Sequence, residues 1–308
     1  MSRTRPEVDV VRLDIQARRD ADRLKEKDRN MNRCARISVL AILVTGIMVS
    51  LSGCNKLAAR DQLNRGVDAY KSAHYEEAIG HFQKAIQLDP NLPMAKTYLG
   101  TALAGNVVPG LDTPDNLKMA DSAIAIFNQV LARNPNDVPS MKQVAAIYLN
   151  IKRYADAKEW QKKVLARDPK DPEASYTVGV VDWTQAHINA MKELGRAGMT
   201  DDGEGNVKAP RKTLEEIRRL NDPLVEEATQ YLHQAISNRE NYYDAMQFMN
   251  LIYRRKADVD FSSPSQVRAD LEAANEWSAK AMGARKASEE KKNASHGGIT
   301  MDSNGNMK

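Results

Sequence analysis

Histidine and cysteine, the side chains best suited to catalysis and metal binding near neutral pH, are few and scattered in this 308-residue chain. No histidine has a second His or Cys at the spacing of a zinc site. The chain also lacks His-Glu-x-x-His, Gly-x-Ser-x-Gly and phosphate-binding glycine-loop motifs. We therefore expect no enzyme active site, no cofactor and no metal. The five histidines are His74, His81, His187, His233 and His296.

Charge is distributed unevenly along the chain. Residues 1–53 contain 11 of the 45 Lys and Arg residues and 7 of the 41 Asp and Glu residues, so the remaining 255 residues carry no net charge. A nucleic-acid-binding protein normally presents a net basic face. The neutral body therefore argues against a nucleic-acid partner.

An uncharged apolar segment covers residues 37–53 and follows two arginines. A basic stretch followed by an apolar stretch is the layout of a secretory signal, which normally spans about 15–30 residues. Counted from the first residue the signal would be too long, whereas counted from Met31 it has 23 residues. We therefore predict a signal peptide over residues 31–53. Residues 1–30 are then a charged N-terminal extension, either a mis-assigned start or dispensable.

The apolar segment ends in Leu51-Ser52-Gly53-Cys54, which resembles the lipobox of bacterial lipoproteins. The resemblance implies that Cys54 receives acyl chains such as palmitate and that cleavage occurs just before it. Two or more chains anchor a protein firmly, because each buried methylene contributes roughly 0.8 kcal/mol. Asn55 stands where Asp would imply inner-membrane retention, so the resemblance favours the outer membrane, facing the periplasm.

Two other interpretations of this segment stay open. Seventeen apolar residues reach the lower limit of a membrane-spanning helix, so residues 37–53 would then form an uncleaved anchor with a cytoplasmic arm. Alternatively, Cys54 is an ordinary thiol. Cleavage would leave Cys54 as the single cysteine of the mature chain, which excludes an intramolecular disulfide.

Small residues recur at a fixed interval in the body of the chain, a pattern to seek before local structure. The clearest unit, residues 59–92, has Gly66 and Ala78 where two antiparallel helices would approach closely. Phe82 would fill the space beside them, and Pro90 would stop the second helix. This unit resembles the tetratricopeptide repeat. Related units follow at residues 93–137, 138–171, 172–242 and 243–286.

The resemblance implies an all-α fold, a right-handed solenoid of about five helix pairs over residues 59–286. One unit cannot bury its apolar face alone, whereas three or more stacked units bury a continuous core. Each pair then contacts only its neighbours along the chain. Residues 287–308 are polar, so we predict a disordered tail there.

Repeats two, four and five are longer than the others, with extra residues between the two helices at 105–113, 196–222 and 257–263. Each loop ends in a capping residue followed by proline, which predicts a sharp helix start. Equivalent loops project from one edge of a solenoid, where insertions often form a binding face. The alternative is loop length tolerated without function. The predicted starts are Thr113-Pro114, Asp222-Pro223 and Ser263-Pro264.

The longest of these loops contains an acidic stretch, residues 201–206, with the sequence Asp-Asp-Gly-Glu-Gly-Asn. A calcium loop needs alternating acidic ligands and a glutamate at its twelfth position. The spacing here does not meet that requirement. We therefore expect a mobile polar loop instead of a cation site.

The tetratricopeptide resemblance also implies a groove lined by the first helix of each pair. Aromatic side chains beside hydrogen-bond donors suit an extended peptide or a helix, because Tyr, Trp and Arg dominate binding hot spots. For any single residue, ordinary solenoid surface is the alternative. The groove candidates are Tyr70, Lys71, Thr101, Lys142, Asn150, Tyr176, Trp183, Gln247, Arg254 and Arg255.

Together these features predict a lipid-anchored scaffold of the bacterial cell envelope that binds protein or peptide segments. Clients in envelope, secretion or pilus assembly follow by analogy alone. One rival is a solenoid that binds an envelope polymer such as peptidoglycan by stacking on Tyr176 and Trp183. A less favoured rival is an enzyme with a site at the loop edge.

Overall fold

The computed structural model describes residues 54–92 and 94–295. The predicted extension at 1–30, the signal peptide at 31–53 and the end of the tail at 296–308 lie outside the described residues. The described part is all-helical, as expected. Within it, no helix is both long enough and apolar enough to cross a bilayer.

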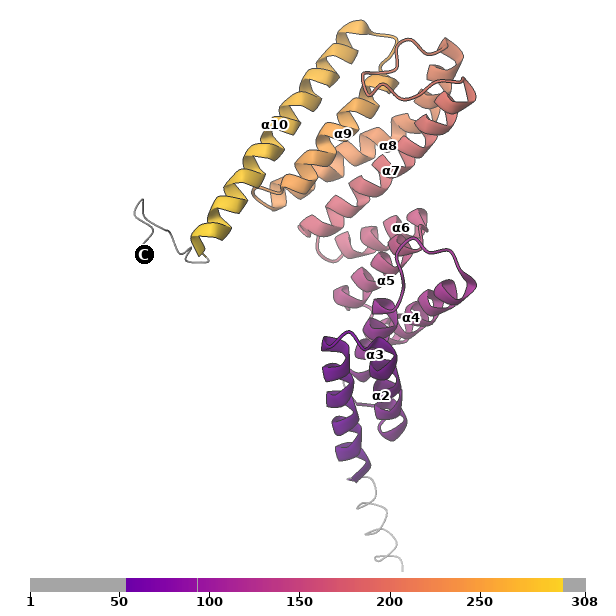
Figure 1. The fold of residues 1–308 in the computed structure, drawn as a ribbon, viewed down its shortest axis with the longest axis vertical. Helices are drawn as coiled ribbons and strands as arrows, with labels where there is room; N and C mark the ends of the chain where they lie inside the picture. Colours follow the sequence, from indigo (N-terminus) through magenta and orange to yellow (C-terminus); the bar gives the residue numbers. More distant parts are fainter. Residues whose placement is uncertain (1–53, 93, 296–308) are drawn as a thin grey trace, which may run out of the picture.

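The helices form successive antiparallel pairs that stack into a solenoid (Figure 1). Every labelled helix packs against the next one along the chain, and α3 also contacts α5 as α7 contacts α9. The predicted arrangement of five helix pairs is therefore confirmed. The pairs are residues 54–71 with α2 (Tyr75–Leu88), α3 (Ala95–Gly105) with α4 (Pro114–Arg133), α5 (Val138–Asn150) with α6 (Tyr154–Leu165), α7 (Pro172–Arg196) with α8 (Arg211–Asn238), and α9 (Tyr243–Val259) with α10 (Pro264–Ser295).

Glycine lets the two helices of a pair approach closely. A Cβ added at Gly66 would stand 2.5 Å from the ring of Phe82. One added at Gly179 would stand 2.6 Å from Leu232. Both contacts are shorter than van der Waals separation, so a larger residue would push the pair apart. The repeat pattern in the sequence thus has the packing role expected of it.

Side-chain caps start α4, α5 and α7. Asp171 accepts hydrogen bonds from the backbone N–H groups of Glu173 and Ala174 at 3.0 and 2.9 Å, ahead of α7. Thr113 accepts one from Asn116 at 3.4 Å, and Pro114 begins α4 as predicted. The predicted start at Pro264 is also confirmed, because α10 begins there.

The predicted helix start at Pro223 is wrong. Helix α8 begins at Arg211, and Pro223 lies inside it, so the inserted loop is much shorter than residues 196–222. The helix continues through the proline because Asn221, fully buried, donates from Nδ2 to the Ala186 carbonyl at 2.8 Å and accepts from Asn189 at 3.0 Å. These bonds hold α8 on α7 where the helical ladder is interrupted.

The predicted loop at 257–263 and the predicted disorder from residue 287 also need correction. Helix α9 runs to Val259, which leaves a shorter connection to α10. Helix α10 continues through Ser295. Its last turns carry the i,i+4 ion pairs Arg285–Glu289 at 3.0 Å and Lys286–Glu290 at 4.0 Å, which favour a helix despite the polar composition.

Candidate partner-binding surface

We call the surface formed by residues 54–71, α3, α5, α7 and α9 the A face, because it carries the first helix of each pair. Its most distinctive feature is a cluster of aromatic side chains on α7 and α9. Tyr176 and Trp183 both contact Phe248 edge to face, with ring centroids 5.6 and 5.2 Å apart. The three rings are partly exposed. We call Tyr176, Trp183 and Phe248 the aromatic ledge.

Neighbouring rings fix the ledge in place. Tyr242 packs on Tyr176 at 5.2 Å, and His187 stacks on Trp183 at 5.2 Å with an interplanar angle of 9°. Burial raises the pKa of Tyr176 to about 12, and Asp244 adds to the shift. The hydroxyl of Tyr176 therefore stays neutral at physiological pH, and no hydrogen bond to it occurs among the described residues. It can donate one to a ligand.

Sequence reasoning identified Tyr176 and Trp183 but missed Phe248 and Tyr242. Phe248 occupies a position next to the expected groove positions of its repeat, and Tyr242 precedes α9. An available signal was the density of aromatic residues at the start of this helix, where Tyr242, Tyr243 and Phe248 fall within seven residues.

The candidates in the N-terminal repeats are more widely spaced. Tyr70 packs against Tyr75, with ring centroids 5.5 Å apart, and Lys71 is exposed. The hydroxyl of Thr101 donates to the Thr97 carbonyl at 2.9 Å. Asn150 is partly exposed, and its carbonyl accepts a hydrogen bond from the inserted loop before α4. These residues do not form a cluster comparable to the aromatic ledge.

Lys142 is engaged within the protein. Its Nζ pairs with the carboxylate of Asp171 and lies 3.6 Å from Glu173. Arg239 also pairs with Glu173, at 3.0 Å. Burial alone would raise the pKa of Asp171, but its bonds to Lys142 and to backbone N–H groups outweigh burial and lower it. Lys142 therefore joins α5 to the start of α7 and is not a free cation of the groove.

Arg254 and Arg255, neighbours in the sequence, differ in burial: Arg254 is partly exposed and Arg255 is buried. Gln247 is exposed, whereas Arg254 donates to the carbonyl of Gly203 at 2.8 Å and to Asn250 at 3.0 Å. The prediction that Arg255 lines the groove is wrong, because this side chain is only 3% exposed. It pairs with Asp201 at 2.7 Å and with Asp258 at 2.9 Å.

The same contacts overturn the expectation of a mobile loop at residues 201–206. Asn206, 1% exposed, donates from Nδ2 to Asp201 and to Asp258 at 2.8 Å each. The loop is thus packed on α9 by buried polar contacts. Within residues 54–92 and 94–295, no group of three or more His, Cys, Asp or Glu side chains is arranged to hold a metal ion.

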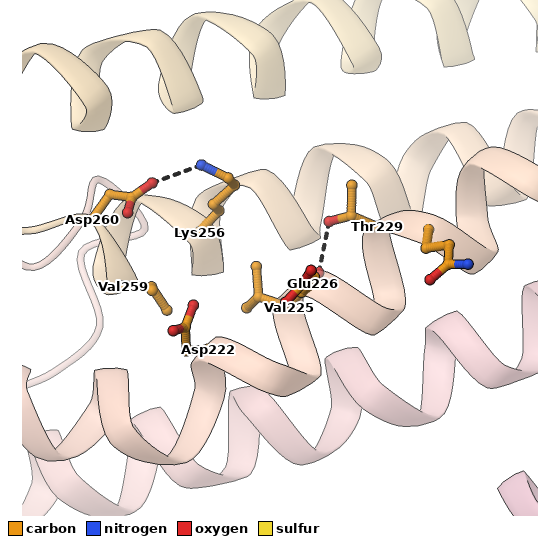
Figure 2. Close-up of a pocket in the computed structure, with 8 residues that line it drawn as sticks. Asp222, Val225, Glu226, Thr229, Lys256, Val259 and Asp260 are labelled. Carbon is orange, nitrogen blue, oxygen red and sulfur yellow. Dashed lines mark hydrogen bonds and ion pairs between the residues drawn. The ribbon is translucent and has the colours of Figure 1, made fainter.

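A hollow of about 420 Å³ lies between α8 and α9 (Figure 2). Val225 and Val259 supply apolar walls, and Glu226 lies on the α8 side. Lys256 reaches Asp260 at 2.6 Å, as the dashed line in Figure 2 shows. A second acceptor, Asp270 at 3.0 Å, holds the same ammonium group. The structure places Asp222, predicted as a helix cap, in the lining of this hollow.

Comparison with known families explains the architecture. Residues 59–92 and residues 117–178 each match a tetratricopeptide repeat model. The chain contains tetratricopeptide repeats. The solved chain of MamA from Desulfovibrio magneticus RS-1, from residue 41 to its end, is 19% identical with a TM-score of 0.50. The match covers 75% of this chain and 96% of that solved chain. A double mutant of MamA RS-1 gives the same values. At this identity the likeness shows the fold, a tetratricopeptide-type solenoid.

A curated relative is Hsp70-Hsp90 organizing protein 2 of Arabidopsis thaliana, 22% identical over 195 residues. The match covers 63% of this chain and 31% of the relative, so the chain spans about a third of that protein's length. The matched repeats support a scaffold for protein–protein interaction.

Proposed function

We propose that this chain is a lipid-anchored scaffold of the bacterial cell envelope that binds an extended segment of a partner protein along its A face. The observation that carries the binding proposal is the aromatic ledge of Tyr176, Trp183 and Phe248. Tyr and Trp are prominent in binding hot spots because they offer large, rigid contact areas with a polar tip. The clients expected are components of envelope, secretion or pilus assembly.

The engagement of cationic side chains on the A-face helices favours an apolar segment over a highly charged ligand. Lys142 and Arg254 are engaged by groups of the protein itself, so a charged partner would have to displace those groups. The exposed side-chain amide of Gln247 is available to hydrogen-bond a peptide backbone. A partner with apolar side chains at alternating positions of an extended strand meets both conditions.

Site-specific photocrosslinking in intact cells tests this proposal. A photoreactive residue replaces Gln247 in the full chain, and a second strain carries it in place of Arg218, an exposed residue of α8. We expect protein crosslinks from the first position that are lost when Trp183→Ala is added. Thermal melting of the Trp183→Ala variant checks that it remains folded. Crosslinks that are unaffected by Trp183→Ala would remove the ledge from the proposal.

The polymer-binding rival predicts a different result. His187 stacks on Trp183, so one face of the indole is already covered and only the other can stack on a sugar. Pull-down with purified peptidoglycan separates the two ideas. Retention that depends on both Tyr176 and Trp183, without protein crosslinks at position 247, would favour the polymer.

The anchoring proposal rests on the lipobox resemblance and on the position of Cys54, which is an exposed free cysteine in the structure. Mass spectrometry of the N-terminal peptide from cells is expected to find Cys54 at the amino terminus with acyl chains attached. Cys54→Ser should move the protein out of the outer-membrane fraction. An intact residue 37–53 segment on an unmodified Cys54 would instead establish an uncleaved anchor.

A further inference from the structure

An apolar hollow lies where α4, α5 and α6 meet, near the C-terminal ends of α4 and α6. Its volume is about 390 Å³. Its apolar lining includes Leu131 of α4, Met141 of α5 and Trp160 of α6. The hollow shares no lining residue with the aromatic ledge, which belongs to α7 and α9.

Cationic side chains form the rim of the hollow. Lys163 places its ammonium group 4.1 Å from the centroid of the Trp160 ring and pairs with Glu159 at 2.8 Å. Arg167 also lines the hollow and is exposed. Among the described residues, no ion pair or hydrogen bond engages the Arg167 guanidinium. Arg133, at the end of α4, does not line the hollow, but it too is exposed and without such a partner in that part of the chain.

Among the described residues, the acidic residues nearest to these arginines along the chain form no ion pair with them. Asp137 accepts a hydrogen bond from the backbone N–H of Ser140 at 3.1 Å. Asp168 accepts one from the backbone N–H of Lys170, also at 3.1 Å. Both carboxylates are thus oriented by local backbone N–H groups, Asp137 as the N-cap of α5. The hollow combines an apolar interior with a basic rim, which complements a ligand that is apolar at one point and acidic beside it.

We propose that this hollow binds an acidic segment of a partner protein that inserts one large apolar side chain. The side chain would contact Trp160 and Met141, and a carboxylate next to it would pair with the guanidinium of Arg167, whose planar fork suits a carboxylate. A membrane surface is a poorer match, because it would require a broad basic face and the body of the chain is neutral. The site does not depend on the A-face proposal.

The test measures fluorescence anisotropy of a labelled peptide, Glu-Asp-Phe-Leu-Asp-Glu, with the full chain purified in detergent. We expect saturable binding by the wild type and at least tenfold weaker binding by Arg167→Glu. Ala166→Leu, which fills the hollow from an exposed position, should weaken binding similarly. Arg218→Glu is the matched control, because it reverses the charge of an exposed arginine on another second helix and should leave binding unchanged.

Three further arms make the result decisive. A peptide with Lys in place of each acid, and one with Ala in place of Phe and Leu, should both fail to bind. Gln247→Ala should leave binding intact, since it alters only the A face. Absence of wild-type binding, equal binding by Arg167→Glu and Ala166→Leu, or loss of binding on Gln247→Ala would each overturn the proposal. Arg167-dependent binding to phosphatidylglycerol vesicles in place of the acidic peptide would also overturn it.

Discussion

Nη2 of Arg255 lies 2.8 and 2.7 Å from the two carboxylate oxygens of Asp201, which joins helix α9 to the loop between α7 and α8. Arg255 is 3% exposed, and its other terminal nitrogen lies 2.9 Å from Asp258. The pair thus connects two repeats through a buried charge, and both the loop and the helix depend on it.

Arg255→Ala is expected to destabilise the protein by about 3–5 kcal/mol, because it leaves Asp201 and Asp258 without their buried cation. Urea denaturation measures the loss, and hydrogen exchange should show faster exchange of residues 201–206. Arg254→Ala is the neighbouring control, since Arg254 is partly exposed and its removal should cause a smaller loss. Equal effects of the two substitutions would contradict the role assigned to Arg255.

A second prediction concerns pH and the contact between α6, α7 and α8. Nζ of Lys158 lies 2.5 Å from Asp182 and 2.8 Å from Glu227. Burial raises the pKa of Asp182 to about 6 although Lys158 opposes the shift. A carboxyl whose folded pKa exceeds its unfolded value stabilises the fold at low pH, and that contribution is lost as pH rises through the folded pKa.

We therefore expect the unfolding free energy of the wild type, relative to Asp182→Asn, to increase as pH falls from 7 to 5. Burial would raise the pKa of Glu227, but its bonds to Lys158 and Lys162 outweigh burial and lower it to about 2, so Glu227 does not titrate in this range. Urea denaturation of both proteins at several pH values provides the measurement. A constant difference across the range would show that Asp182 remains charged throughout.

A third prediction compares two glycines of α7. Gly179→Ala should be destabilising, because its Cβ would stand 2.6 Å from Leu232 and 3.3 Å from the backbone carbonyl of Ala228. Overpacking of this kind costs about 1–3 kcal/mol. Gly195→Ala meets nothing within 4 Å and should stabilise the helix by up to about 1 kcal/mol. Thermal melting of both variants measures these effects. A change in melting temperature of the same sign in both variants would contradict the packing described.

A fourth prediction concerns Pro223, which is exposed in the interior of α8. Pro223→Ala restores a backbone donor and should stabilise the protein by about 1–3 kcal/mol, since proline costs about 3 kcal/mol in a helix interior. Pro210→Ala is the control, because Pro210 immediately precedes the helix, and it should bring no such gain. A loss of stability in Pro223→Ala would mean that the proline has a role in packing.

Much of the fold could be predicted because small residues at a fixed interval indicate close packing between antiparallel helices. Gly66 and Gly179 mark close helix contacts in the sequence as clearly as in the structure. The helix starts at Pro114 and Pro264 followed from a cap residue and a proline. The same pattern was wrong at Asp222-Pro223, because the buried Asn221 bonds α8 to α7 and this tertiary contact outweighs the local preference.

The candidate site was harder to predict for a related reason. Position within the repeat places Arg255 on the groove side, but the inserted loop brings Asp201 to it from another repeat and buries it. A contact across 54 positions of the chain leaves no periodic signal. Phe248 was missed because its exposure depends on how α7 and α9 pack, which repeat position alone does not describe.

The longest described helices lie in the last two pairs: α3 has 11 residues, whereas α8 has 28 and α10 has 32. At 1.5 Å per residue, these correspond to roughly 16, 42 and 48 Å. The stack therefore has a narrow end and a broad end, which are not interchangeable by any rotation. An elongated ligand that lies along the solenoid meets different side chains in its two orientations. This difference in width therefore gives the protein a means of selecting the N-to-C orientation of a bound polypeptide.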